Sequence, residues 1–424
     1  MPQNWKPSRV FFGWWVVGAS LLTALYVGGA VFYGFTTIFE PLANEMGWSY
    51  TQIALGPSLL GVEAGLMAPL LGIFADRWGP RKLIFTGAVV TAGGLFLLSQ
   101  ITSLAMFYGA LALMAIGISC CTMTVLMTAV SGWFRKKVGL ASGIAVSGFG
   151  FGGLLIPVMV KLIDVYEWRT AVTILAVGML VIVLPLSLVF RHKPEQYGYL
   201  PDGEAIDTSK TNGDPSFPQA AEVEVNARAA LKSRTFWQLA LAYTFQVMFV
   251  SSTVTHVMPY LSSIGFSRSM ASVVATAIPL TSIAGRFGLG WLGDKHNRRL
   301  VAAGAFAMMG VGSFFFGYAA SAGAWSLVFF IILFGIGYGG GTSLRPSLGR
   351  EYFGRTSFGT IFGLIMGINM LGGLTGPPLA GWVYDNWGNY QGVWFVFAGL
   401  AAVALTLVLT TRPLNKAIEL PAEA

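Results

Sequence analysis

The sequence predicts an all-α membrane protein with 12 transmembrane helices, arranged as two pseudo-symmetric halves of six helices each. Three observations predict this class: the composition, the length of the apolar runs and a repeat between the halves. Of 424 residues, 55% are hydrophobic and 10% are charged, against about 25% charged in an ordinary soluble domain. With 54 Gly, 31 Phe and 13 Trp, the chain has too little polar surface to cover a water-soluble protein of this size.

The apolar runs are long enough for helices that cross a bilayer, which need about 20 apolar residues each. None alternates with a period of two residues, so a transmembrane β-barrel is excluded. The first run is too long for the core of a signal peptide and lacks a cleavage site, so we expect it to remain as the first span. The predicted spans cover residues 11–39, 51–75, 83–101, 104–132, 138–163, 168–190, 235–262, 268–293, 300–320, 323–348, 356–384 and 388–411.

One long polar segment interrupts this pattern. Residues 191–233 are rich in charge and proline and have no sustained apolar face, as expected of a solvated linker. The predicted organisation is therefore an N-terminal six-helix bundle over 1–190, a cytoplasmic linker over 191–233 and a C-terminal six-helix bundle over 234–424.

The net charge of +8, from 26 Lys and Arg against 18 Asp and Glu, indicates orientation rather than a nucleic-acid partner. The basic residues form short clusters on alternate loops, as cytoplasmic loops do. We therefore expect a multi-pass protein of the cell's inner or plasma membrane, with both termini in the cytoplasm and the lipid bilayer as its surroundings. Cys120 and Cys121 are adjacent within an apolar run, which suggests neither a disulfide framework nor a metal site.

The two halves repeat each other. The run from Asp76 to Arg81 after span 2 corresponds to the run from Asp294 to Arg299 after span 8, 218 positions later. Asn297 takes the place of Gly79, and both residue types tolerate a left-handed backbone. Parallel six-helix repeats place a ligand site at the interface of the halves near the bilayer midplane, with alternating access.

Three motifs carry a family resemblance. The run from Gly72 to Lys82 resembles the signature of the major facilitator superfamily between helices 2 and 3. Within that superfamily, Gly13-Trp14-Trp15 and the run from Trp133 to Gly143, continuing to Gly153, are similar to the monocarboxylate transporter and oxalate:formate antiporter branch. The resemblance implies a small carboxylate as substrate.

Charged side chains in the loops that follow spans 2 and 8 are candidates for gating. An acidic residue there can cap a helix N-terminus, and the cations can pair in one access state and separate in the other. The gating candidates are Asp76, Arg77, Arg81 and Asp294; a solvated loop that only obeys the positive-inside rule is the alternative.

Arg286 is the predicted substrate anchor. It lies deep in span 8, where an arginine costs about 2.5–3.5 kcal/mol even on the lenient insertion scale. Its guanidinium fork binds a carboxylate bidentately and stays charged. The resemblance also implies a helix 8 arginine here. The alternative is a structural ion pair with Glu63, the other fully charged residue deep in a span.

Further residues are predicted around the anchor. Ser282 lies one turn from Arg286 on the same helical face, and Asn369 is a weaker candidate. The resemblance places Tyr338 as a cavity aromatic and Tyr33, Met123 and Phe149 as cavity-lining side chains. His256 is predicted as part of the site or of the proton path, since histidine titrates near neutral pH, and Glu63 is the other proton-coupling candidate; packing roles are the alternatives for all of these residues.

Some positions depart from the family pattern. The oxalate exchangers carry a lysine on helix 11, and alignment on Gly372-Gly373 places Ile365 there; one fixed cation suits a monoanion better than a dianion. Animal monocarboxylate transporters have an aspartate and a lysine where this chain has Ser282 and Gly34. Arg345, near the cytoplasmic end of span 10, is expected to extend to the membrane surface or pair with a gate loop.

The sequence holds no nucleotide-binding loop, nucleophile elbow or zinc-binding helix motif, so we predict no enzyme activity and no cofactor. The leading hypothesis is a monomeric secondary transporter of small monocarboxylates such as lactate or pyruvate, coupled to protons in symport. The alternatives are an anion exchanger of the oxalate:formate type and a membrane sensor or scaffold built on a transporter fold.

Overall fold

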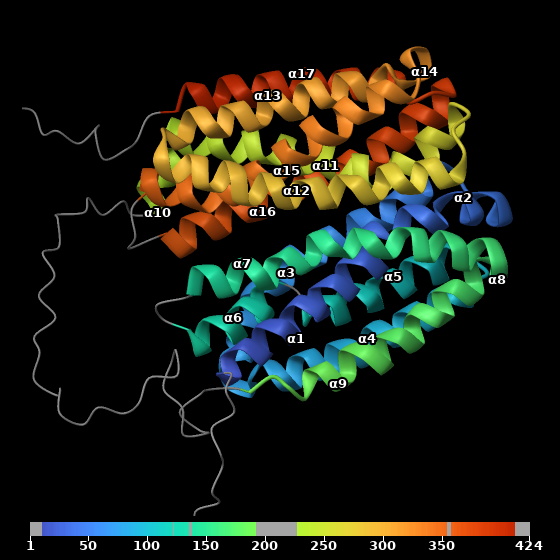
Figure 1. The fold of residues 1–424 in the computed structure, drawn as a ribbon, viewed down its shortest axis with the longest axis horizontal. Helices are drawn as coiled ribbons and strands as arrows, with labels where there is room; N and C mark the ends of the chain where they lie inside the picture. Colours follow the sequence, from blue (N-terminus) through green and yellow to red (C-terminus); the bar gives the residue numbers. More distant parts are fainter. Residues whose placement is uncertain (1–10, 122, 135–137, 192–226, 354–357, 412–424) are drawn as a thin grey trace, which may run out of the picture. The chain divides into compact units, whose positions relative to one another are not determined.

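A computed structural model describes residues 11–121, 123–134, 138–191, 227–353 and 358–411 of the chain. Those residues form helices and connecting turns, with no strand among them (Figure 1). Helices lie over all twelve predicted spans, which confirms the predicted fold class. By length and composition, eight helical stretches of the described ranges can cross a membrane.

The first half of the chain contains nine α-helices and three short helical segments of other types within the described residues. They are α1 (Phe12–Val27), η1 (Gly28–Tyr33), α2 (Phe35–Met46), α3 (Tyr50–Trp78), α4 (Pro80–Ser99), α5 (Leu104–Ser119), α6 (Met123–Trp133), α7 (Val138–Phe151), η2 (Gly152–Leu154), α8 (Leu155–Gly178), η3 (Met179–Val183) and α9 (Leu184–Ser187).

The second half is built from longer, less interrupted helices. They are α10 (Ala227–Lys232), α11 (Arg234–Ser263), α12 (Arg268–Lys295), α13 (Arg298–Gly317), α14 (Ala319–Ala322), α15 (Ala324–Phe353), α16 (Phe358–Trp387) and α17 (Gln391–Leu409). Several retain an internal proline, as in α11 at Pro259 and α12 at Pro279, which neighbouring helices make tolerable in a membrane.

The turn between predicted spans 5 and 6 resembles the turn between spans 11 and 12. α8 changes direction at Glu167, whose φ is 66°, and the chain turns between α16 and α17 at Gly388, whose φ is 67°. Glycine adopts this backbone freely, whereas glutamate does so at a cost of about 1–3 kcal/mol. The two halves therefore share this turn with different residues.

The loops after spans 2 and 8 differ more than the sequence repeat predicts. Gly79 has a φ of 79° before α4, but Asn297 has a φ of −62° and is not left-handed. Asn297 therefore does not use the left-handed backbone that this residue type tolerates. Asn297 instead caps α13, because its side-chain oxygen accepts hydrogen bonds from the backbone N–H groups of Arg299 and Leu300.

The described residues belong to two compact units. Unit 1 takes them from Met1–Gly34, Leu66–Leu155 and Lys161–Pro215, and unit 2 from Phe35–Gly65, Ile156–Val160 and Ser216–Ala424. The first span thus passes from unit 1 to unit 2 after Gly34.

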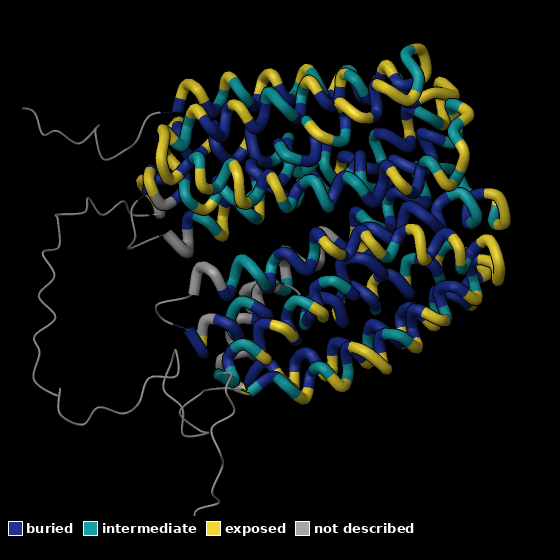
Figure 2. The backbone as a smooth tube through the Cα atoms, in the orientation of Figure 1, coloured by how far each residue is buried: buried dark blue, intermediate teal, exposed yellow. Residues whose placement is uncertain are grey.

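Each unit has its own helix pairs. In unit 1, α1 packs on α7, and α4 packs on α5. In unit 2, α15 packs on α12 and α13, α11 on α16, and α13 on α17. Exposed positions recur along α13 and α17 in Figure 2, while the buried positions of these helices face the unit's core. This pattern suits helices with one side toward lipid.

Candidate functional site

Arg286 and Tyr338 lie side by side in unit 2. The Arg286 Cζ atom is 5.9 Å from the centroid of the Tyr338 ring, within the range of a cation–π interaction. The two residues come from adjacent helices, α12 and α15. A Cβ atom on Gly339 would collide with the Ser282 backbone carbonyl, so this glycine lets the two helices approach closely at the level of the arginine.

Ser282 and Asn369 are both buried in unit 2. The Ser282 hydroxyl donates to the Pro279 carbonyl of its own helix at 2.7 Å. The Asn369 side-chain oxygen accepts a hydrogen bond from the Thr244 hydroxyl of α11 at 3.2 Å, while its side-chain nitrogen is buried without a hydrogen-bond partner. Asn369 therefore retains a donor for a ligand, and Ser282 would have to give up a bond within its helix to contact one.

His256 is fully buried on α11 and bonded through both ring nitrogens. Nε2 lies 2.8 Å from the Pro377 carbonyl oxygen, which only accepts, so Nε2 carries a proton. Nδ1 lies 2.9 Å from the Tyr390 hydroxyl. In the neutral imidazole Nδ1 is then the acceptor, and the Tyr390 hydroxyl donates to it. These bonds join α11, α16 and the turn before α17.

The candidates of the first half that can be placed lie in unit 1. Tyr33 is buried at the end of η1. Phe149 on α7 is half-buried, and its ring centroid lies 6.3 Å from that of Phe32. The side chains of Glu63, Met123, Asp76 and Arg77 lie outside the described residues, although their backbone belongs to α3 and α6. Arg81 is exposed in the first turn of α4.

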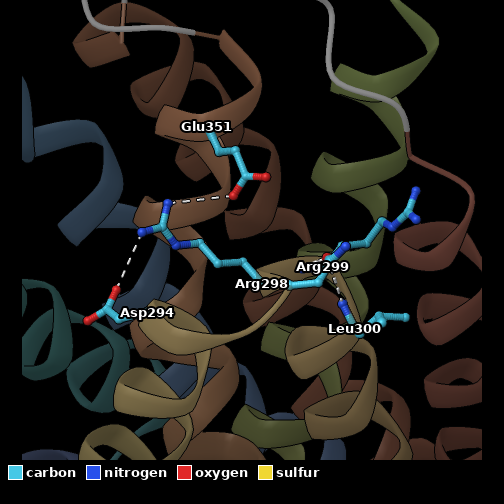
Figure 3. Close-up of polar contacts among 6 residues, drawn as sticks. Asp294, Arg298, Arg299, Leu300 and Glu351 are labelled. Carbon is cyan, nitrogen blue, oxygen red and sulfur yellow. Dashed lines mark hydrogen bonds and ion pairs between the residues drawn. The ribbon is translucent and has the colours of Figure 1, made fainter.

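Asp294 belongs to a polar cluster at the ends of three helices of unit 2, the Asp294 cluster of Asp294, Arg298 and Glu351 (Figure 3). One Arg298 nitrogen lies 3.4 Å from an Asp294 oxygen, and the other lies 3.5 Å from a Glu351 oxygen. Arg298 thus links α12 to α15 from the start of α13. Asp294 is 72% exposed, so this ion pair contributes little to stability.

A second polar cluster lies where α3 begins, and we name it the Asp385 cluster (Tyr50, Thr51 and Asp385). The Asp385 carboxylate of α16 accepts hydrogen bonds from the backbone N–H groups of Tyr50 at 3.0 Å and Thr51 at 2.9 Å. It also accepts one from the Thr51 hydroxyl. A carboxylate in this position satisfies the free N–H groups of the helix and complements its dipole.

Two further contacts connect α2 to the second half of the chain near that cluster. Arg268, at the start of α12, donates to the Thr37 carbonyl at 2.9 Å. The Ser262 hydroxyl of α11 donates to Glu40 at 3.2 Å. All these contacts lie within unit 2, so residues from α2 and the start of α3 are bound to α11, α12 and α16.

Arg345 differs from the sequence prediction. Among the described residues, its side-chain partners come from α11 and α16 rather than from a gate loop. One of its terminal nitrogens donates to the Gln246 side-chain oxygen of α11 at 2.9 Å, and its Cζ atom lies 4.7 Å from the centroid of the Tyr243 ring. The other terminal nitrogen lies 3.7 Å from the Met366 sulfur. The prediction was wrong because α11 and α16 offer nearer partners inside the unit.

The roles of Gln246, Glu40 and Asp385 were not predicted from the sequence, and the surroundings of Arg345 were predicted wrongly. Gln246 is an amide in the middle of an apolar span and 1% exposed, and a polar residue at such a position is a signal in itself. Asp385 lies at the end of a span, where nothing in the sequence indicates that it caps a helix that begins 335 residues earlier. No group of three or more potential metal ligands occurs among the described residues.

The comparison with protein families agrees with this architecture. The model of the Major Facilitator Superfamily matches residues 19–267 and 239–424. The chain belongs to the Major Facilitator Superfamily. It is a multi-pass membrane transporter, not an enzyme.

Curated relatives within this superfamily cover nearly the whole chain at low identity. Monocarboxylate transporter 12-B of Danio rerio is 26% identical over 94% of this chain and 86% of its own. Monocarboxylate transporter 13 of Bos taurus is 26% identical over 97% and 92%. The oxalate:formate antiporter of Oxalobacter formigenes is 24% identical over 97% and 95%.

Solved structures support the fold alone. A single-site mutant of the nucleoside transporter NupG aligns with a TM-score of 0.74 at 16% identity, over 95% of this chain and 100% of that one. A bacterial homolog of the human lysosomal transporter Spinster aligns with a TM-score of 0.66 at 15% identity, over 95% of both chains.

Proposed function

We propose that this protein is a secondary active transporter that carries small monocarboxylates, such as lactate and pyruvate, by alternating access and in symport with protons. It acts as a monomer in the cell's inner or plasma membrane, with both termini in the cytoplasm. The observation that carries the proposal is the arginine deep in α12 beside the ring of Tyr338. The named relatives, which are monocarboxylate transporters and an oxalate:formate antiporter, support the substrate class.

Arg286 is the proposed anchor of the substrate carboxylate. Its guanidinium offers two parallel N–H donors to the two carboxylate oxygens, and the Tyr338 ring centroid lies 5.9 Å from its Cζ atom. The Tyr338 hydroxyl is proposed to donate to the carboxylate or to a hydroxyl on the adjacent carbon. Ser282 is proposed to supply a further polar contact, and the cavity-lining roles of Tyr33, Met123 and Phe149 stay predictions from the sequence.

A monoanion fits this anchor better than a dianion does. Ile365, where the exchangers carry a lysine, is an apolar residue 2% exposed on α16. An exchanger of the oxalate:formate type is the second candidate, favoured by the similarity to the named antiporter over nearly its full length.

Glu63 is the proton carrier that we propose to test first. A carboxyl group in a membrane span can cycle between its neutral and charged forms as its surroundings change. His256 would have to break a bond to the Pro377 carbonyl before both nitrogens could serve a proton path. Its contacts favour a role in holding α11 and α16 together.

The two polar clusters are proposed as gates. The Asp385 cluster holds the start of α3 against α16, and alternating access requires such contacts to break and re-form. The Asp294 cluster links the end of α12, the start of α13 and the end of α15. We propose that Asp76, Arg77 and Arg81 play the corresponding part in the first half of the chain.

Uptake into proteoliposomes tests the proposal. Purified protein is reconstituted, and entry of labelled lactate, pyruvate, formate and oxalate is measured with and without an inward proton gradient. We expect lactate or pyruvate uptake that the gradient accelerates. Protein with Arg286→Gln and empty liposomes are the controls.

Other outcomes separate the alternatives. Uptake of oxalate in preference to lactate, independent of the gradient and dependent on internal formate, identifies an exchanger. Binding of a carboxylate without any flux identifies a sensor built on the transporter fold. Either result contradicts proton-coupled monocarboxylate transport.

A further inference from the structure

Unit 2 contains a second arginine in its interior, and its surroundings differ from those of a structural arginine. We name its surroundings the Arg345 cluster (Tyr243, Gln246, Arg345 and Met366). Arg345 is partly exposed, but its Nε atom is buried without a hydrogen-bond partner. Its hydrogen-bonding partners among the described residues are one amide oxygen and one thioether sulfur. Neither neutralises the charge of the guanidinium, and a thioether is a weak acceptor.

We propose that Arg345 is a second binding position for a small carboxylate, one that the substrate occupies on its way to or from Arg286. A cation without an anionic partner in the interior of a membrane protein is costly and usually marks an ion or substrate pathway. The Tyr243 ring covers one face of the guanidinium. A carboxylate would therefore approach the edge of the guanidinium, where its N–H groups point.

The neighbouring helix supplies a further donor. Asn369 lies one turn from Met366 on the same face of α16, and Met366 contacts Arg345. The Asn369 side-chain nitrogen is buried with no acceptor. Two groups on adjacent helices thus present donors that the described part of the protein leaves without acceptors, and an anion supplies what both lack.

The spacing along α15 explains why this is a separate position. Tyr338 and Arg345 are seven residues apart, so they lie on the same face of the helix and about 10 Å apart along it. Tyr338 is the residue beside Arg286. We therefore infer that the two arginines bind carboxylates in succession. This inference rests on the proposed function for the identity of the anion and for the route past Arg286.

Gln246→Glu tests the proposal without removing the arginine. Glutamate has nearly the same shape as glutamine, and its oxygen would take the position 2.9 Å from Arg345. It would supply a resident carboxylate, which neutralises Arg345 and competes with an added one. The Gln246→Glu variant should fold, because a charge-assisted hydrogen bond to Arg345 replaces a bond to a neutral acceptor.

The measurement is thermal unfolding of purified protein while formate replaces chloride at constant ionic strength. The Arg286→Gln variant serves as the background, so that formate binding at Arg286 does not mask formate binding at Arg345. A ligand that binds only the folded protein raises its unfolding temperature. We expect formate to stabilise the background protein, and Gln246→Glu to weaken its apparent affinity by about tenfold or more.

Gln238→Glu is the matched control. Gln238 is another buried amide on α11, and its nitrogen donates to the Thr410 hydroxyl. The same change there should leave the formate response intact. If Gln246→Glu responds to formate like its background, or if formate gives no stabilisation over chloride, the proposal is overturned.

Wild-type uptake separates this inference from the proposed function. If no carboxylate enters proteoliposomes but formate still stabilises the protein in a manner sensitive to Gln246→Glu, the transport proposal fails and the second binding position stands. If uptake proceeds and Gln246→Glu changes neither uptake nor formate binding, the transport proposal stands and the second position fails.

Discussion

Five arginines that the structure describes fall into two groups with different surroundings. Arg169 donates to the Ser99 and Ile101 carbonyls at 2.8 and 2.9 Å. Arg268 and Arg299 likewise donate to the backbone carbonyls of Thr37 and Thr411. Arg345 instead donates to a side-chain amide, and Arg286 lies beside the Tyr338 ring. The first three arginines donate mostly to carbonyl groups at helix ends. Arg286 and Arg345 lie well inside long helices.

The helix position of an arginine separates structural from functional cations in a membrane protein. Carbonyl groups at the end of a helix have no partner in that helix, so an arginine that reaches them stabilises the fold. In the middle of a helix the carbonyl groups are already bonded, and an arginine there has few backbone acceptors. The partners of Arg345 among the described residues are an uncharged amide oxygen and a thioether sulfur, so a substrate anion can supply an acceptor of opposite charge.

The largest expected effect is at the proposed anchor. Arg286→Lys keeps the positive charge but loses the bidentate fork. Loss of one charge-assisted hydrogen bond, worth about 1.5–3 kcal/mol, should lower the initial rate of lactate uptake into proteoliposomes by more than about tenfold. The unfolding temperature serves as the check on folding. Normal uptake by this variant would contradict the bidentate anchor.

A double-mutant cycle tests whether the two interior arginines act separately. Arg286→Lys and Gln246→Glu are measured alone and together in the same uptake assay. If the two positions bind carboxylates independently, their free-energy effects should add to within about 0.5 kcal/mol. A coupling larger than about 1 kcal/mol would show instead that both arginines hold the same carboxylate at once.

Arg169 represents the structural group. Arg169→Gln removes charged donors from two carbonyls near the end of α4, so the free energy of unfolding should fall by about 1–3 kcal/mol. The Michaelis constant for lactate should not change. Thermal unfolding and uptake kinetics measure the two effects. A changed Michaelis constant with unchanged stability would remove the distinction between the groups.

The smallest effects are expected from two hydroxyl deletions. Tyr338→Phe keeps the ring beside Arg286 but removes a donor to the substrate, so the apparent affinity for lactate should fall by about threefold to tenfold, as expected for a neutral hydrogen bond. Tyr243→Phe removes a hydroxyl that is buried without a hydrogen-bond partner. This second variant should unfold at the same or a higher temperature and bind lactate normally.

The sequence alone was sufficient to predict the helices. Apolar runs about as long as a bilayer is thick have few alternatives to a membrane-spanning helix, and helices lie over every predicted span. Arg286 was also recognisable as a site candidate, because a charge deep in such a run needs a partner whatever the packing.

The tertiary structure alone decided the partners of each polar side chain. Arg345 was expected at the membrane surface, but Gln246 and Tyr243 of α11 lie close enough to hold it inside unit 2. Asp385 caps a helix that begins at Tyr50. Hydropathy along a chain records how deep a residue lies, whereas contacts across helices depend on helix rotation and spacing. Helix rotation and spacing are set by packing, for example by the close approach of α12 and α15 at Gly339. No local sequence pattern encodes such a contact.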